Sequence, residues 1–187
     1  MTTISQQVIR TTGLLDQLSD ITRLGAGSLT IDRHEADFAL IVDQIVQEYQ
    51  AANQQHTIAF DTDAKALIGR FDQGRIAQVV AAMIGNALKF SFDGGAVNVL
   101  LRQQRADHGN TVAQFTVRDT GVGIPDGEQE RVFERFFRGS NVRGTYAGLG
   151  VGLYIARTIM DMHGGRIWLE SGQGLGTTSH MALPLTA

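Results

Sequence analysis

The spacing of apolar residues changes along the chain, and each change predicts a different element of secondary structure. Residues 1–27 predict one long helix, because apolar or small side chains alternate at spacings of four and three, as in a coiled-coil seam of about three heptads: Ile4, Val8, Thr11, Leu15, Leu18 and Thr22. The run Gly25–Ser28 predicts where this helix ends. We interpret the helix as one that pairs outside its own domain; the alternative is a helix packed on that domain.

The rest of the chain predicts three more helices and a set of strands. Asp37 and Asp72 are expected to cap two helices, one with an apolar face from Phe38 to Tyr49 and one over 73–89, and a third helix is expected over 149–162. Strands are expected where short apolar or alternating runs are bounded by turn residues: 29–32, 57–60, 66–69, 96–105, 111–118, 166–170 and 177–183. Because strands occur on both sides of the central region, we expect both halves to build one sheet.

Composition excludes several classes of function. The chain has 187 residues, enough for one domain with an appended element, and its net charge of −3 gives no electrostatic case for binding nucleic acid or an anionic membrane. Zero cysteines exclude disulfides and thiolate metal sites. We expect neither a membrane span nor a signal peptide here, and a cytoplasmic location, although the full-length parent protein could be membrane-anchored.

Asp119 stands where an expected strand meets a glycine run. Ala113, Phe115 and Val117 before it are apolar, and Gly121, Gly123 and Pro125 follow the aspartate. A carboxylate at a strand end can accept a hydrogen bond from the exocyclic amine of adenine, whereas guanine presents a carbonyl oxygen at that place. The sequence therefore predicts an adenine contact at Asp119.

A second glycine run, Gly148–Gly152, opens the expected third helix. Glycines let the backbone approach a ligand, and N–H groups at a helix start favour phosphate. Alone the run is a weak signal, because short glycine patterns also occur in ordinary turns. Two runs that bracket the aromatic and arginine-rich segment 132–138 are more specific.

Asn86 and Lys89 lie three residues apart on the second expected helix and so share a face. An amide oxygen is a suitable ligand for Mg²⁺, which would bridge phosphate oxygens, and the lysine adds a positive charge for the phosphates. A polar pair on a solvated helix face is the alternative interpretation of these two residues alone.

Four motifs of this chain resemble those of sensor histidine kinases, in that family's order and at about its spacing. Asn86–Ser91 resembles the asparagine box, Asp119–Pro125 the first glycine box, Phe133–Arg138 the phenylalanine box and Gly148–Leu153 the second glycine box. The resemblance covers roughly residues 30–185 and implies the α/β ATP-binding fold shared with gyrase, heat-shock chaperone ATPases and mismatch-repair ATPases. In this Bergerat-type, two-layer α+β sandwich, helices cover a mixed, mostly antiparallel sheet, and a mobile lid lies over the nucleotide.

The resemblance also implies a domain division, ligands and site residues. Residues 1–28 would be part of a dimerisation and phosphotransfer hairpin, and 29–187 the catalytic domain that binds ATP and Mg²⁺, with Asn86 as magnesium ligand. Asn86, Lys89 and Arg138 would carry the chemistry, with Arg138 as the preferred phosphate contact among the lid arginines Arg135, Arg138 and Arg143. The nucleotide contacts would be Asn86, Lys89, Phe90, Asp119, Gly121, Gly123, Ile124, Phe133, Arg138, Gly148, Leu149, Gly150, Val151, Gly152, Leu153 and Thr177.

Ala82 departs from the family pattern. The family often has a second asparagine or an acidic residue one turn before the magnesium asparagine, and alanine can neither transfer a proton nor position water. We therefore expect little ATP hydrolysis.

The five histidines do not resemble the family's phosphoacceptor motif. We expect His34, His56 and His108 at the surface, a structural role for His163 in a turn, and His180 as a tolerated substitution in the last strand. The acceptor histidine would then lie outside this chain, which is either a fragment of a longer kinase or a natural chain that acts on a partner.

We expect a histidine kinase catalytic domain whose partners are a response regulator and the acceptor helices of the same kinase, as a homodimer in the parent. A degenerate, non-catalytic ATP-binding module is the alternative, favoured by Ala82. A serine-directed kinase of the same superfamily is a third interpretation, which the long first helix and the full phenylalanine box disfavour.

Overall fold

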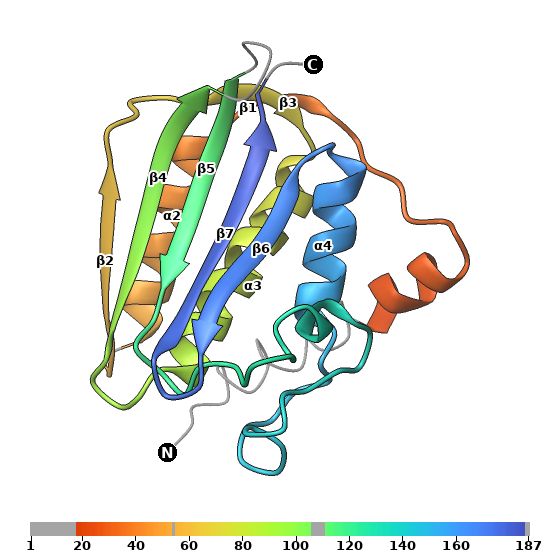
Figure 1. Cartoon of the computed structure of the whole chain (residues 1–187). Helices are drawn as coiled ribbons and strands as arrows, with labels where there is room; N and C mark the ends of the chain where they lie inside the picture. Colours follow the sequence, from red (N-terminus) through yellow and green to blue (C-terminus); the bar gives the residue numbers. More distant parts are fainter. Residues whose placement is uncertain (1–17, 54, 106–110, 186–187) are drawn as a thin grey trace. The chain divides into compact units, whose positions relative to one another are not determined.

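The computed structural model describes residues 18–53, 55–105 and 111–185 (Figure 1). The chain divides into two units, residues 1–30 and 31–187. In the first unit residues 18–25 are helical, and Gly27, with a φ of 62°, donates its N–H to the carbonyl of Leu24 at 3.1 Å. The glycine run therefore ends the helix as predicted. Residues 1–17, with most of the predicted heptad seam, lie outside the described residues.

The second unit is built on a five-stranded sheet with the order β2-β4-β5-β7-β6 (Figure 1). Its strands are β2 Thr57–Thr62, β4 Ala96–Arg105, β5 Thr111–Arg118, β6 Arg166–Gly172 and β7 Gly176–Pro184. β2 runs parallel to β4, and every other neighbouring pair is antiparallel. The predicted mixed, mostly antiparallel sheet from both halves of the chain is confirmed.

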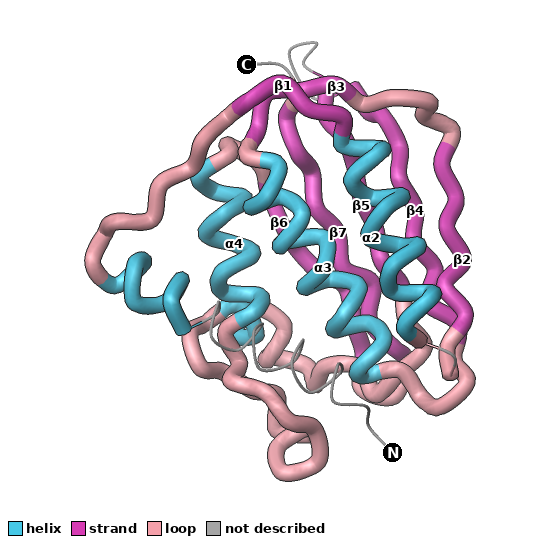
Figure 2. Tube along the Cα trace, turned by 180° about the vertical axis from the view of Figure 1, so that it is seen from behind, coloured by secondary structure: helices cyan, strands magenta, loops and turns pink. Residues whose placement is uncertain are grey.

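Three helices cover one face of this sheet, as the two opposite views show (Figures 1 and 2). They are α2 Phe38–Ala52, α3 Gln73–Phe90 and α4 Gly152–Met162. Asp37 Oδ1 accepts the N–H of Ala39 at 2.9 Å, and Asp72 Oδ1 accepts that of Arg75 at 3.0 Å. Both predicted N-caps are confirmed, and they fix where α2 and α3 begin.

The core lies between the sheet and the helices. Alternate residues of the central strands are buried against the helices, as period-two patterning requires: Val97, Val99 and Leu101 on β4, and Ala113, Phe115 and Val117 on β5. Phe38 of α2 packs edge-on against Phe115, with ring centroids 6.2 Å apart. Among the described residues no helix combines the length and hydropathy needed to cross a membrane.

The prediction of a strand over 29–32 is wrong. The strand is β1, His34–Asp37, which pairs antiparallel with β3, Ile68–Phe71, in a separate two-stranded sheet. Leu67 explains the offset of β3 from the predicted 66–69, because its N–H binds Asp37 Oδ1 and its carbonyl accepts from Phe38 N, both at 2.9 Å. The pairing of β1 with β3 therefore starts at Asp37, the N-cap of α2, and continues to His34. Three of the four residues of β1 are polar, so the apolar pattern of the sequence did not predict this strand.

The third helix begins at Gly152 and not at residue 149. Gly148 has a φ of 145° and Gly150 a φ of 70°, and neither value is compatible with a right-handed helix. Leu149, which was expected inside the helix, lies before it in a loop. The glycine run therefore leads into α4 instead of forming its first turn.

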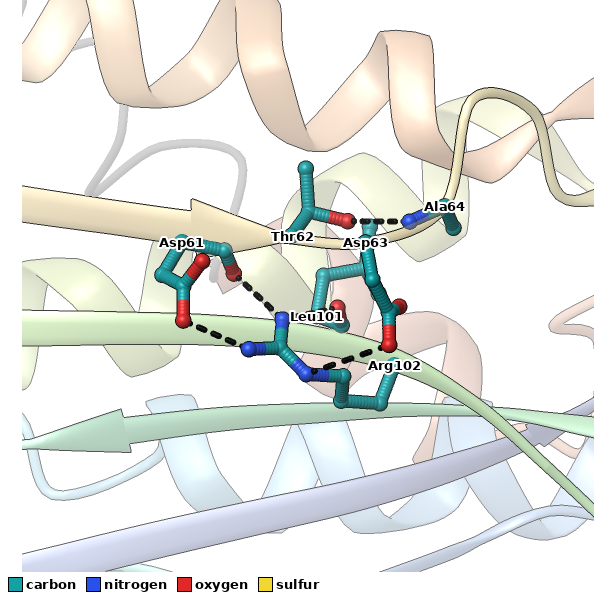
Figure 3. Close-up of polar contacts among 6 residues, drawn as sticks. All are labelled: Asp61, Thr62, Asp63, Ala64, Leu101 and Arg102. Atoms are coloured by element: carbon teal, nitrogen blue, oxygen red, sulfur yellow. Dashed lines mark hydrogen bonds and ion pairs between the residues drawn. The ribbon is translucent and has the colours of Figure 1, made fainter.

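An arginine fastens the edge strand β2 to β4 (Figure 3). Arg102 Nη2 lies 2.5 Å from Asp61 Oδ2, its Nη1 donates to the Asp61 carbonyl at 3.1 Å, and its Nε lies 3.6 Å from Asp63 Oδ2. One guanidinium thus holds the end of the only parallel strand pair of the described sheet.

Candidate nucleotide-binding site

Asp119 lies at the end of β5, where the sequence places it, and is only 5% exposed. Its Oδ1 accepts the N–H of Gly121 at 2.9 Å and that of Thr177 at 3.2 Å. Burial raises the pKa of this carboxyl group, while the two backbone hydrogen bonds act in the opposite direction. Both of these hydrogen bonds end on Oδ1. The other oxygen, Oδ2, receives no hydrogen bond from the described residues, so it can accept one from a ligand.

The glycines around Asp119 allow three backbone segments to meet. A β-carbon at Gly121 would overlap the carbonyl oxygen of Phe90, at the end of α3. One at Gly123 would overlap that of Gly172, and one at Gly176 that of Asp119 itself. Gly121 and Gly123, predicted as ligand contacts, therefore have a packing role that would by itself require glycine.

Ser171 completes this junction and was missed from the sequence. Its Oγ accepts the N–H of Ile124 at 2.9 Å and donates to the carbonyl of Gly176 at 2.8 Å. Thr177 Oγ1 lies 2.9 Å from the same hydroxyl. Thr177 is thus hydrogen-bonded both to Asp119 and to Ser171, and its contact with nucleotide stays a prediction. A serine before the glycine-rich turn 172–176 was the available signal.

The end of α3 brings Lys89 to the second glycine run. A β-carbon built on Gly148 would lie 3.0 Å from Lys89 Nζ. The ammonium also lies 4.6 Å from the centroid of the Phe90 ring, and the carbonyl of Phe90 accepts the N–H of Val122 at 3.1 Å. The structure therefore joins the asparagine box to both glycine runs, although the sequence separates them by tens of residues.

Asn86 is half-buried on α3, and no hydrogen bond from the described residues reaches its amide. An amide oxygen that stays available, one turn from Lys89, fits the chemistry of a magnesium ligand. Among the described residues no group of three histidine, aspartate or glutamate side chains could hold a metal. Ala82 lies one turn earlier on α3 and is half-buried. Position 82 therefore has no polar side chain next to Asn86 on the helix.

The segment between the glycine runs, which we call the lid, begins on a short 3-10 helix, η2, Arg131–Phe133. Phe133 is buried, with the guanidinium of Arg157 from α4 4.6 Å from its ring centroid. It contacts α4 and so anchors the lid, whereas Phe136 is 58% exposed and adopts a φ of 63°.

Arg138 binds the lid itself. Its Nη2 donates to the carbonyl of Val142 at 3.3 Å and to that of Tyr146. Asn141, missed from the sequence, donates its Nδ2 to the carbonyl of Gly123 at 2.9 Å and so ties the lid to the first glycine box. Glu128 accepts the N–H of Ser140 at 2.9 Å, and this hydrogen bond lowers the pKa of the carboxyl group. A phosphate contact of Arg138 stays a prediction.

The remaining predicted contacts lie around the entrance of α4. Gly150 packs against the phenylalanine box, since a β-carbon there would overlap the carbonyl of Phe137. Val151 is buried as the N-cap residue of α4, Leu149 is 39% exposed, and Leu153 is half-buried in the first turn. Their contact with nucleotide stays a prediction.

Of the histidines, His34 is exposed as predicted, and His108 lies outside the described residues. The prediction for His56 is wrong: it is 8% exposed, with Nδ1 3.1 Å from the carbonyl of Gly95. Its polar neighbours in the sequence suggested a surface, but the turn before β4 covers the ring. His163 is buried, as its structural role requires, and His180 stacks on Trp168 with ring centroids 5.0 Å apart.

A sheet covered by helices on one face, with a buried aspartate and a glycine-bounded lid at one end, defines an ATP-binding domain of the α/β sandwich class. Residues 71–187 match the family model described as "Histidine kinase-, DNA gyrase B-, and HSP90-like ATPase". The match covers more than half of the chain, which therefore belongs to this family.

Relatives and solved structures agree with this assignment. The chain is 28% identical over 172 residues to the sensor protein kinase WalK of Staphylococcus aureus, a match that covers 91% of this chain and 28% of WalK from strain MRSA252, or 41% of another WalK sequence from that species. The chain thus spans less than half the length of these curated relatives.

Two solved histidine kinases show the same fold. The mycobacterial sensor histidine kinase MprB is 27% identical, with a TM-score of 0.68 over 82% of this chain and 97% of MprB. Full-length ShkA in complex with AMPPNP is 26% identical, with a TM-score of 0.74 over 100% of this chain and 40% of ShkA.

Proposed function

We propose that this chain is the catalytic domain of a two-component sensor histidine kinase, which binds Mg·ATP and transfers its γ-phosphoryl group to a histidine outside this chain. A response regulator aspartate would then receive the phosphate. The observation that carries the proposal is Asp119: its Oδ1 is bound to the N–H groups of Gly121 and Thr177, which leaves Oδ2 to accept from an adenine amine. Likeness to WalK, MprB and ShkA supports it.

Asn86 would hold the magnesium ion, because its amide is half-buried and meets no other hydrogen-bonding group of the described residues. When bound, Mg²⁺ would neutralise charge on the phosphate oxygens. Lys89, on the same face of α3 as Asn86 and with its ammonium beside Gly148, would bind the phosphates as well.

Phosphoryl transfer depends on positioning and on electrostatic stabilisation far more than on proton transfer. The chain offers both: the cation of Lys89 and backbone N–H groups at the entrance of α4 would hold the phosphates, and Arg138 organises the lid through two carbonyl groups. Arg135 and Arg143 are exposed on the same lid and are placed for contact with a partner or with nucleotide.

The acceptor histidine would come from the hairpin that residues 1–28 would complete. His163 is excluded as acceptor by burial, and its two ring nitrogens already bind Asp72 N and the carbonyl of Ile159. The acceptor histidine would then lie outside this chain. We further propose that the parent kinase acts as a homodimer in the cytoplasm, and that this segment contacts neither membrane nor nucleic acid.

A degenerate ATP-binding module is the second candidate, and Ala82 is the observation that favours it. Such a module would bind nucleotide, change its lid contacts and regulate a partner without phosphoryl transfer. Adding a hairpin that carries an acceptor histidine, together with radiolabelled ATP, separates the two: only a kinase labels the hairpin, in an acid-labile and base-stable form.

Calorimetric titration of Mg·ADP and Mg·AMPPNP tests the common part of both candidates. We expect micromolar binding by the wild type and loss of at least tenfold in affinity in Asp119→Asn, which places an amide where a carboxylate is needed. Asp126→Asn is the matched control, because Asp126 is exposed in the same loop. Binding that survives unchanged in Asp119→Asn would contradict the adenine site.

A further inference from the structure

The last part of the lid contacts the end of α3 through a pair of aromatic rings. The Tyr146 ring lies 5.1 Å from that of Phe90, at an interplanar angle of 61°. This edge-to-face arrangement is an attractive geometry for two aromatic rings. Tyr146 belongs to no motif that the sequence singled out, and it is half-buried while Thr145 and Ala147 on either side of it are exposed.

The Phe90 ring also carries the cation of the site. Lys89 Nζ lies 4.6 Å from the ring centroid, within reach of a cation–π attraction. Two residues after Tyr146, a β-carbon at Gly148 would lie 3.0 Å from the same Nζ. Tyr146, Phe90, Lys89 and Gly148 therefore form one contiguous cluster, with the lid on one side and the end of α3 on the other.

Tyr146 is itself held by the lid backbone. Its N–H donates to the carbonyl of Val142 at 3.3 Å, and its carbonyl accepts from Arg138 Nη2. Val142 is 8% exposed and anchors this turn. The ring is thus presented to Phe90 by a turn with several fixed points.

We propose that Tyr146 is a positioning residue for phosphate binding: through the Phe90 ring it keeps the Lys89 ammonium beside the Gly148–Gly152 run. The inference rests on the proposed function and adds a residue to it. Tyr146 acts through Lys89, so it contributes to the affinity for the phosphates and leaves the affinity for the adenine base unchanged.

The difference between a nucleotide and its nucleoside tests this role. Loss of one aromatic pair corresponds to about a two- to tenfold change in an equilibrium constant. We expect Tyr146→Ala to weaken Mg·AMPPNP by about fivefold in displacement titrations, with adenosine affinity unchanged. Tyr146→Phe, which keeps the ring, should bind both as the wild type does, and Thr145→Ala is the matched control on an exposed neighbour.

A double-mutant cycle with Lys89→Met tests the coupling. If Tyr146 acts through the ammonium, Tyr146→Ala should cost almost nothing further once the lysine is removed. Additive losses would overturn the proposal, as would an equal loss for adenosine, which would make Tyr146 a base contact. Tighter binding by Tyr146→Ala would overturn it too, because the ring would then obstruct the site.

Tryptic cleavage after the exposed Arg143 in nucleotide-free protein provides a readout that needs no ligand. Release of the ring should accelerate this cleavage in Tyr146→Ala and not in Tyr146→Phe. If the wild type binds no nucleotide, the proposed function fails. If the wild type binds nucleotide and Tyr146→Ala changes neither the cleavage rate nor the affinity, only the role of Tyr146 is overturned.

Discussion

The ring of His163 joins the end of α4 to the start of α3. Its Nε2 accepts the N–H of Asp72 at 3.0 Å, and its Nδ1 donates to the carbonyl of Ile159 at 2.7 Å. The Asp72 side chain in turn accepts the N–H of Asp32 at 2.9 Å, and Arg33 Nη2 donates to the carbonyl of Met162 at 2.6 Å. Asp32 and Arg33 therefore bind the start of α3 and the end of α4. The opposite ends of these two helices carry Lys89 and Gly152.

This arrangement predicts a loss of stability in mild acid. Burial is the main cause that lowers the pKa of His163, and a proton on Nε2 would also face the N–H of Asp72. The unfolded chain, with an ordinary histidine pKa of about 6.5, then binds the proton more readily than the folded chain. The stability from neutral His163 is therefore full above about pH 6.5 and is lost as the pH falls through the lower folded-state pKa.

Urea unfolding at pH 7.5 and pH 5.5 measures this effect. His163→Gln should lower the free energy of unfolding at pH 7.5 by about 1–3 kcal/mol, through lost buried hydrogen bonds, and should reduce the difference between the two pH values. His180, whose pKa burial also lowers, contributes in the same direction, so His180→Gln serves as the comparison. Equal pH dependence in wild type and His163→Gln would contradict the prediction.

The sequence predicted the elements that local chemistry determines. The caps Asp37 and Asp72 lie where they were expected, and the antiparallel pair β4 and β5 has the predicted bounds, because each carries a strong local signal. Asp119 was found for the same reason: a strand with apolar residues at alternate positions ends directly before it.

What the sequence did not predict depends on contacts between distant segments. β1 is set by pairing with β3, the burial of His56 by the turn at Gly95, and Ser171 matters only because Ile124 and Gly176 come to it. α4 begins three residues later than predicted because the backbone at Gly150 is left-handed. The spacing of apolar residues does not predict a left-handed backbone.

Two glycines should respond in opposite ways to alanine. At Gly121 a β-carbon would overlap the carbonyl oxygen of Phe90, and rigid backbone cannot move aside, so we expect Gly121→Ala to destabilise by about 3 kcal/mol. At Gly152 nothing lies within 4 Å, and the residue is helical, so Gly152→Ala should stabilise by about 0.5 kcal/mol. Thermal unfolding of the two variants measures both changes, and similar shifts in both would show that close packing does not explain Gly121.

Removal of the Arg102 side chain should loosen β2 (Figure 3). The guanidinium is the link to Asp61 and Asp63, but both acidic side chains are mostly exposed, so we expect Arg102→Ala to cost only about 1 kcal/mol, and less in high salt. Amide exchange in β2 should accelerate while exchange in β5 stays unchanged. Lys65→Ala, on an exposed residue of the following loop, is the control, and equal acceleration across the whole sheet would contradict a local role.

Ala82 predicts slow ATP hydrolysis that substitution can raise. The residue lies one turn before Asn86 on α3, where a carboxylate could accept a proton from water or an amide could position it. We expect Ala82→Glu to raise phosphate release by about tenfold, and Ala82→Asn by less, since an amide cannot serve as a base. Ala82→Leu adds volume without a polar group and should stay at the wild-type rate. If all three variants release phosphate at that rate, Ala82 does not limit hydrolysis, and the evidence for a degenerate site is lost with it.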